Sequence, residues 1–224
     1  MKILVIAPHP DDEVLGMGGT IARLSHENHD ITVAIATKGW APLFPASLVD
    51  QVRAEAKEAN ALLGVKSLRF MDLPVTRLNE KPLHELNACF DQLIGEEKPS
   101  MVFLPFVGDR HEDHTIVYNA CMVAMRPLAN RKHIKKILCY ETVSETHWSA
   151  AYVEKNFSPH VWVDISPYLP YKIEAMSKYI SQIQPEPDAR SIEALTALAK
   201  WRGSTAGMYA AESFVVVRDC RHLA

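Results

Sequence analysis

Two clusters of acidic and histidine side chains have the residue types and spacing of a metal site. His9-Pro10-Asp11-Asp12-Glu13 directly follows a short apolar run, and His111-Glu112-Asp113-His114 lies a few residues after a second such run. Imidazole and carboxylate are borderline ligands that suit zinc. A structural zinc site usually has four protein ligands including Cys, and no Cys is near either cluster. Three protein ligands with one position left for water therefore fit the pattern better.

Such a site is suited to hydrolysis. A metal of this kind lowers the pKa of a bound water to about 7 and polarises a carbonyl oxygen. Of the remaining side chains, a carboxylate can accept the proton of that water, and a His can bind the developing oxyanion or protonate a leaving amine. The two clusters contain every one of these groups.

The simpler interpretation of each cluster is structural. A single His-Pro or Asp-Asp after a strand is usually a solvated loop or a helix N-cap, and Asp113 alone could cap the helix that follows it. Two His-rich acidic clusters, each following a strand, favour the interpretation as one site.

The elements around the clusters alternate between strand and helix. Apolar and β-branched runs predict strands, and apolar spacing of three and four residues predicts helices. The predicted strands are Ile3 to Ala7, Asp30 to Thr37, Ser67 to Met71, Ser100 to Phe106, Lys136 to Val143, His160 to Ile165 and Ser213 to Arg218. The predicted helices are Gly16 to Glu27, Leu48 to Leu63, Leu83 to Glu97, Asp113 to Met125, Pro167 to Gln182 and Asp188 to Ala206.

This order predicts an α/β fold: a Rossmann-like, doubly wound, mostly parallel sheet with helices on both faces. In the usual strand order 3-2-1-4, the first and fourth strands are neighbours and the winding direction reverses between them. Ligands bind beyond the carboxyl ends of the strands at this point. We therefore expect the two clusters to face each other across one crevice.

The composition bounds the function. With 224 residues, 48% hydrophobic and 23% charged, we expect a single domain over residues 1–224, with the parallel part in about 1–145 and a C-terminal extension in 146–224. A net charge of −3 argues against nucleic acid as a partner. The chain has no apolar run long enough to span a membrane. The run Ile3 to Ala7 is too short for a secretion signal, so we predict a cytoplasmic protein with reduced cysteines.

The paired motifs resemble the PIG-L/LmbE-like family of zinc-dependent N-deacetylases, which act on N-acetylglucosaminyl and other N-acetyl sugars. The resemblance covers most of the chain. Further matches occur in the family's order: Arg53-Ala54-Glu55, Phe157-Ser158-Pro159, Val163-Asp164-Ile165, Lys172, Ser181-Gln182, 199–203 and Ala211-Glu212-Ser213-Phe214.

This resemblance implies a role for each site residue. His9, Asp12 and His114 match the zinc ligands, and Asp11 matches the general base. His111 matches the His that stabilises the oxyanion, and Asp113 matches the carboxylate that orients and charges it. Arg53 matches a substrate-contacting Arg. Some members have a Tyr two residues before the second motif, where this chain has Asp109. The implied substrate is a small N-acetylated sugar or glycoconjugate.

Two alternatives remain open. A metal-dependent phosphoesterase usually needs two metals bridged by carboxylates, and Glu13, Asp109 and Glu112 could supply the additional ligands. A metal-binding module without turnover is disfavoured by Asp11, since a protein that only holds zinc needs no additional carboxylate. A homo-oligomer is compatible with the sequence.

Three further features are weaker evidence of function. The glycines in Gly16-Met17-Gly18-Gly19 do not form a dinucleotide fingerprint, and we expect them to let the backbone pass close to the metal site. Trp40 and Trp148 follow predicted strands, where each could stack on a sugar or simply pack.

Overall fold

Strand β1 (Lys2–Ala7) lies at the centre of the computed structural model, which describes residues 1–148, 150, 152 and 155–221. Ile3 and Val5 belong to one buried apolar cluster, whereas Leu4 and Ile6 belong to a second. Successive side chains of a strand point to opposite faces, so both faces of β1 are covered. This explains why its sequence is continuously apolar rather than alternating.

Seven strands form one mixed sheet. After β1 they are β2 (Asp30–Lys38), β3 (Ser67–Pro74), β4 (Met101–Pro105), β5 (Lys136–Tyr140), β6 (Val161–Asp164) and β7 (Ala211–Asp219). The order across the sheet is β3-β2-β1-β4-β5-β7-β6. The first five strands in this order pair in parallel, and β7 runs antiparallel to both of its neighbours. The predicted mostly parallel sheet, with the first and fourth strands adjacent, is confirmed.

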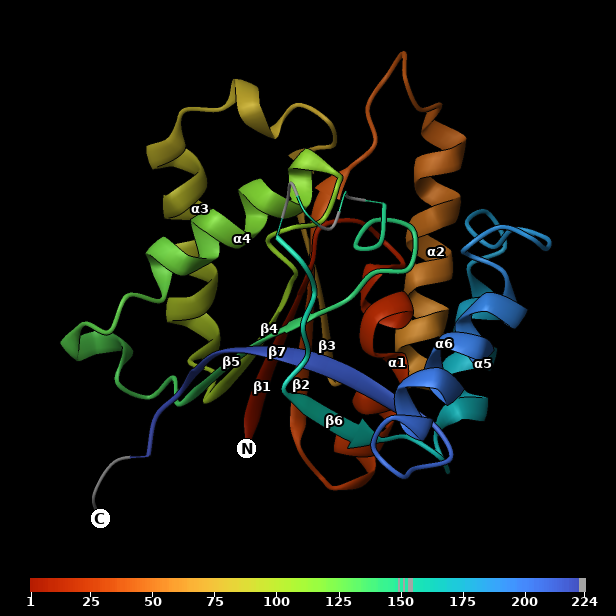
Figure 1. Cartoon of the computed structure of the whole chain (residues 1–224). Coiled ribbons are helices and arrows are strands. Elements are labelled where there is room, and N and C mark those ends of the chain that lie inside the picture. The colour runs from red at the N-terminus through yellow and green to blue at the C-terminus, as the bar shows by residue number, and fades with distance from the viewer. Residues whose placement is uncertain (149, 151, 153–154, 222–224) are drawn as a thin grey trace.

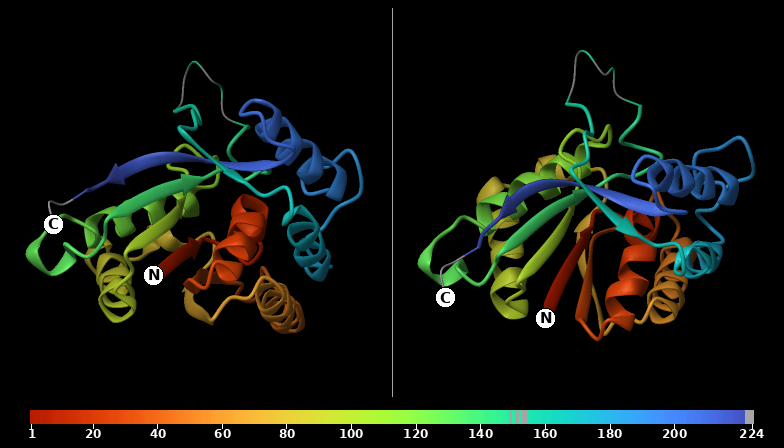
Figure 2. Two further views of the ribbon diagram at one scale, coloured as in Figure 1. Left: turned by 90° about the horizontal axis from the view of Figure 1, so that it is seen from below. Right: turned by 60° about the horizontal axis from the view of Figure 1, so that its bottom comes forward.

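Helices cover both faces of the sheet. They are α1 (Asp12–His26), α2 (Ala46–Leu62), α3 (Leu83–Glu97), α4 (Glu112–Ala124), α5 (Leu169–Lys178) and α6 (Ile192–Ser204), with short 3₁₀ turns η1 (Leu78–Glu80) and η2 (Ala129–Arg131). Helices α1, α2 and α5 pack together on one face, and α3 and α4 pack on the other (Figures 1 and 2). None of the helices in the described ranges is long and apolar enough to cross a bilayer.

Three predicted helices have wrong bounds. Helix α1 begins at Asp12 rather than Gly16, because the amides of Val14 and Leu15 both donate to the carbonyl of Asp11. Acidic residues in the first turn interact favourably with the helix dipole. Helix α5 is shorter than predicted, and α6 begins later, after Ser191, whose hydroxyl accepts the amide of Ala194 at 3.1 Å.

The carboxyl ends of β1 and β4 lie side by side because the two strands pair in register, Ile3 with Met101 and Val5 with Phe103. Each strand leads through a loop into a helix, α1 or α4. The fold therefore brings together the two loops that carry the acid–histidine clusters, as the strand order predicted.

Candidate active site

The first cluster forms a tight turn between β1 and α1. The carboxylate of Asp12 accepts the backbone amide of His9 at 2.8 Å, which closes the turn. Asp11, at the start of α1, has φ = 111°. This is a strained backbone conformation for a residue with a side chain, and such strain is concentrated at functional sites.

The second cluster forms the first turn of α4. The ring Nδ1 of His111 caps this helix by accepting the backbone amide of Asp113 at 3.2 Å. Asp113 and His114 are buried, while His111 is half-buried. Glu112 is exposed.

Three ligand atoms from the two clusters form a nearly equilateral triangle. His9 Nδ1 lies 3.3 Å from Asp12 Oδ2 and 3.3 Å from His114 Nε2, and these last two atoms are 3.2 Å apart. Around a tetrahedral zinc with bonds of about 2.0–2.1 Å, neighbouring ligand atoms are about 3.3–3.4 Å apart. The three residues expected as ligands thus have the chemistry and the spacing of one face of a zinc site, and they form a group able to hold a metal.

A carboxylate contacts the far nitrogen of each of these imidazoles. His114 Nδ1 donates to Asp109 at 2.8 Å, and His9 Nε2 donates to Asp113 at 3.1 Å. Such contacts fix the tautomer and orientation of a metal-ligating His and raise its basicity. The sequence analysis assigned Asp109 no such role.

The charges favour a cation between the two loops. Burial alone would lower the pKa of His114, but Asp12 and Asp109 outweigh it and raise the pKa to about 10. Asp12 is itself buried, yet the two His rings hold its pKa well below the usual range. A divalent cation competes with protons for these same atoms.

The carboxylate of Asp113 forms a hydrogen bond with His9 and not, as the sequence analysis had expected, with His111. Asp113 Oδ2 lies 3.9 Å from His111 Nδ1 but accepts hydrogen bonds from His9 and from the backbone amide of Thr76. Burial, followed by repulsion from His9, lowers the pKa of His111 to about 4. The surroundings of His111 therefore favour a neutral ring over the expected imidazolium. Because Nδ1 accepts a hydrogen bond, the neutral ring carries its proton on Nε2.

The carboxylate of Asp11 has a different environment. Its Oδ2 is buried and accepts no hydrogen bond from the described residues, while Arg190 Nη1 lies 3.4 Å away as an ion pair. Burial raises the pKa of Asp11 to about 8, although the charge of Arg190 opposes this shift. Asp11 is thus an acceptor held beside the metal-binding group without being part of it.

Two carboxylates considered as ligands for a second metal are engaged elsewhere. Glu13 is fully buried, accepting hydrogen bonds from Asn60 at 2.8 Å and from the Tyr179 hydroxyl at 2.6 Å. Asp109 holds His114, as described above. A second group with metal-ligand chemistry, His9, His111 and Asp113, shares the ring of His9 and contains the Asp113 contact already described. Of the three carboxylates considered for a second metal, only the exposed Glu112 then remains, which disfavours the phosphoesterase alternative.

The glycines of α1 have a role other than the one expected. A Cβ on Gly16 would lie 2.2 Å from the ring of buried Tyr140, and one on Gly19 would lie 2.7 Å from Ile165. Helix α1 is also interrupted at Met17. The glycines allow close packing against β5 and the segment after β6, and the expected approach to the metal site is wrong.

A buried ion pair stabilises this interruption. Glu212 accepts the amides of Gly19 and Thr20 at 3.1 and 2.6 Å, and Lys172 Nζ donates to the carbonyl of Leu15 and to Glu212. Buried backbone groups must be paired. Residues from α5 and β7 thus hold the helix that carries Asp12.

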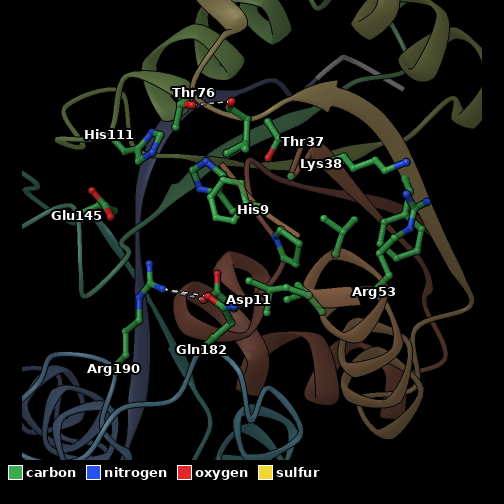
Figure 3. Close-up of a pocket in the computed structure, with 18 residues that line it drawn as sticks. His9, Asp11, Thr37, Lys38, Arg53, Thr76, His111, Glu145, Gln182 and Arg190 are labelled. Carbon is green, nitrogen blue, oxygen red and sulfur yellow. Dashed lines mark hydrogen bonds and ion pairs between the residues drawn. The ribbon is translucent and has the colours of Figure 1, made fainter. Parts of the chain in front are cut away.

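A cavity of about 290 Å³ opens beside the metal-binding group (Figure 3). His9, Asp11 and His111 line it, and Glu145, Gln182 and Arg190 form a polar side near them. Apolar side chains from α2, its preceding loop, β3 and the residue after β3 form an apolar side of the lining: Phe44, Leu48, Val49, Val52, Phe70 and Val75. Lys38 and Arg53 lie across the cavity from Glu145 and Arg190 (Figure 3). The cavity is therefore amphipathic.

Arg53 also lines the cavity, as expected for a residue near substrate. Its guanidinium lies 4.2 Å from the centre of the Phe70 ring and pairs with Asp72. Neither tryptophan lines the cavity: Trp40 donates to the carbonyl of Val75, and the side chain of Trp148 is 66% exposed.

Sequence reasoning missed Glu145 and Arg190 on the polar side of the cavity and named Gln182 only as a match to the family. Glu145 lies in a turn after β5, and Arg190 lies in the segment between α5 and α6. Neither belongs to a contiguous motif. The only sequence signal for these two residues was their position, near Ser181-Gln182 and after the fifth strand. This signal was weak, because charged residues are common in solvated loops.

Comparisons with known proteins agree with this geometry. Residues 4–125 match a family model described as PIG-L: GlcNAc-PI de-N-acetylase. An uncharacterized deacetylase, YaiS of Escherichia coli K12, is 31% identical over 80% of this chain and 90% of that protein. A probable N-acetyl-alpha-D-glucosaminyl L-malate deacetylase 2 of Bacillus anthracis is 28% identical over 80% of each chain.

A solved structure has the same fold. N,N'-diacetylchitobiose deacetylase from Pyrococcus horikoshii, complexed with its inhibitor, superposes with a TM-score of 0.75. It is 25% identical, and the match covers 97% of this chain and 84% of that one.

Proposed function

We propose, from the premise that this chain belongs to the PIG-L family of de-N-acetylases, that it is a zinc-dependent amidohydrolase removing an acetyl group from the nitrogen of a sugar or sugar conjugate. The observation that carries the proposal is the triangle of His9 Nδ1, Asp12 Oδ2 and His114 Nε2, with Asp11 beside it. The reaction adds water to the amide carbonyl, breaks the C–N bond and releases acetate and the free amine.

His9, Asp12 and His114 are the residues that would hold zinc. When bound, the metal supplies Lewis acidity, which polarises the amide carbonyl and acidifies water. Asp109 and Asp113 keep the two imidazoles in the orientation that ligation requires.

Asp11 acts in this proposal as the general base. Its buried Oδ2 has no hydrogen-bond donor to satisfy it among the described residues, so it is free to accept the proton of the attacking water. A base is most effective when its pKa is near the working pH, and burial raises the pKa of Asp11 to about 8.

His111 acts in this proposal as the oxyanion donor. Its Nδ1 accepts the amide of Asp113, which leaves Nε2–H as the donor. The ring lines the cavity near Asp11 and His9 (Figure 3). A preorganised neutral donor is sufficient to stabilise developing negative charge.

The sugar would lie along the polar side of the cavity. Arg190 can only donate hydrogen bonds, the carboxylate of Glu145 accepts them and Gln182 does both, which suits a group of hydroxyls. Arg53 is proposed as a further substrate contact at the far end. The cytoplasmic location and the oligomeric state stay predictions from the sequence.

Mass spectrometry of zinc-loaded protein incubated with a panel of N-acetyl sugars tests the proposal. We expect a loss of acetyl from at least one sugar and no loss after chelation. Asp11→Asn is the matched control, since Asn also tolerates a positive φ. It should retain zinc but lose about 10²–10⁴-fold in kcat. Near-normal turnover by this variant would exclude Asp11 as the base.

A further inference from the structure

The apolar side of the cavity is formed largely by the first two turns of α2. The buried residues of this helix are Glu55, Ala56, Ala59 and Asn60, all in its second half. Leu48, Val49 and Val52 continue the apolar stripe toward the N-terminus at helical spacing, but they line the cavity instead of the core. Figure 1 shows why: the start of α2 extends past the ends of the strands.

Aromatic side chains complete this surface. Phe44 comes from the loop before α2, and Phe70 comes from β3. Both are partly exposed, as are Leu48, Val49 and Val52. Exposed apolar area inside a concave site is what a non-polar part of a ligand covers.

The surface is preformed. A Cβ on Gly39 would lie 2.9 Å from Phe44 Cβ and 3.0 Å from Val49 Cγ2, so the loop backbone packs directly against both side chains. The amide of Phe44 donates to the carbonyl of Trp40 at 2.9 Å, which closes the same loop. The guanidinium of Arg53 is also fixed, because it stacks on Phe70 and pairs with Asp72.

An N-acetyl sugar alone does not match such a surface. An acetyl group has only one methyl to pack against it. Sugar hydroxyls can hydrogen-bond to Glu145, Gln182 and Arg190 on the polar side. The apolar side would then stay in contact with water. The two sides together are complementary to a molecule with one hydroxylated half and one hydrocarbon half.

We propose that the substrate of this enzyme carries an alkyl or aryl group of several carbons, which packs against Phe44, Leu48, Val49, Val52 and Phe70. This inference rests on the proposed amide hydrolysis and specifies its substrate class. The hydrocarbon can belong to the acyl group or to the group on the anomeric carbon of the sugar, and the contact with α2 is the same in both cases.

Two substrate series distinguish these sources. One series lengthens the acyl group of glucosamine from acetyl to butanoyl and hexanoyl, and the other lengthens the glycosidic group of N-acetylglucosamine from methyl to butyl and hexyl. Each fully buried methylene should raise kcat/KM about fourfold. We expect a rise of at least tenfold across one series, and that series identifies the position of the hydrocarbon. A flat response in both series overturns the proposal.

Matched variants test the surface itself. Val→Thr keeps the shape but replaces a methyl by a hydroxyl. Val49→Thr with Val52→Thr should therefore reduce the ratio of kcat/KM for the longest substrate of the responding series to that for its shortest member. Val123→Thr is the control, because Val123 is an exposed helical valine on α4 that does not line the cavity. An unchanged ratio in the double variant contradicts the proposal.

A binding measurement separates this inference from the proposed function. Hexyl and methyl glucosaminides already have a free amine and are not turned over. Calorimetry should give tighter binding of the hexyl compound, with a more negative heat-capacity change. Tighter hexyl binding without hydrolysis of any amide would refute the proposed function alone. Equal binding of both compounds would place the hydrocarbon on the acyl group. Amide hydrolysis with equal binding and a flat response in both substrate series would refute the apolar contact alone.

Discussion

The loops after β1 and β4 and the segment from β5 to α6 both line the cavity, but they are held there in different ways. Each loop carries its chemistry in four or five consecutive residues that hydrogen-bond to one another, as Asp12 does to His9. The later segment contributes Glu145, Gln182 and Arg190, which are far apart in the chain. The comparison suggests that the loops perform the reaction and that the later segment recognises the substrate.

Long-range contacts fix the later segment. The hydroxyl of Thr146 donates to Asp109 at 2.6 Å, which places the turn carrying Glu145 against the carboxylate behind His114. Arg190 Nε donates to Ser144 in the same turn at 3.1 Å. Buried Glu55 accepts the amide of Ser181 at 3.1 Å, next to Gln182. Every one of these contacts joins residues at least 37 positions apart.

The largest expected effect is on a loop residue, His114. Replacing it with Ala removes one of three metal ligands and should empty the site and abolish turnover. His111→Ala should instead keep the metal and lose about 10²–10³-fold in kcat, the usual cost of one oxyanion donor. Elemental analysis of both purified variants checks this, and metal loss confined to His111→Ala would reverse the two assignments.

Sequence reasoning predicted the two loops better than the later segment. The order 3-2-1-4 of the first four strands and the placement of both motifs at neighbouring strand ends were predictable, because they depend on contiguous residues and a common topology. The grouping of His9, Asp12 and His114 was implied by the resemblance of the two motifs to a known family. The partner of Asp113 was not, because a spacing of two residues favours His111, whereas the turn after β1 brings His9 Nε2 to 3.1 Å.

The remaining differences also arise from tertiary contacts. The glycines of α1 look like a ligand-binding loop, yet Tyr140 and Ile165, more than a hundred residues away, explain two of them. Glu145 and Arg190 look like solvated charges, and only the contacts with Thr146, Asp109 and Ser144 bring them to the cavity.

The next largest effect concerns the carboxylates behind the two His ligands. Asp109→Asn and Asp113→Asn should each weaken metal binding about 10–100-fold, the usual cost of losing such a partner. The Asp113 variant shows whether this carboxylate acts on His9 or on His111. If it acts on His9, the variant binds metal more weakly. If it acts on His111 alone, kcat falls and the metal affinity is unchanged. Competition with a chromogenic chelator measures both affinities.

A smaller effect is expected at Arg190, in the later segment. Arg190→Gln removes a charged donor from the polar side and also the ion-pair partner of Asp11, and hydrogen bonds to charged groups contribute about 1.5–3 kcal/mol. This corresponds to at least about tenfold in kcat/KM for a hydroxylated substrate, with the metal content unchanged. Arg126→Gln, an exposed Arg that does not line the cavity, is the control. Loss of metal in Arg190→Gln would show that Arg190 helps to hold the metal. This would contradict the division of roles between the two loops and the later segment.

The smallest effect on turnover is expected from Glu141→Gln, which tests how the later segment is attached. Glu141 is 4% exposed, and its carboxylate accepts two hydrogen bonds from Arg202 of α6, at 2.8 and 2.6 Å, and one from His147 at 2.9 Å. Burial favours its neutral form, but these partners outweigh burial and hold the pKa of Glu141 below the usual 4.5. A carboxylate with a lowered folded-state pKa adds stability above about pH 4.5, and this stability is lost as the pH falls through the folded value.

Breaking a buried ion pair costs about 3–5 kcal/mol, so the Gln variant should be clearly less stable than the wild type at pH 7. The difference in free energy of unfolding between the two proteins should then narrow as the pH falls from about 5 to 3, because only the wild type has this carboxylate to protonate. Urea unfolding at several pH values measures it. A difference that stays constant with pH would mean that Glu141 stabilises α6 by shape and neutral hydrogen bonding, and that its charge contributes nothing to holding the later segment on the sheet.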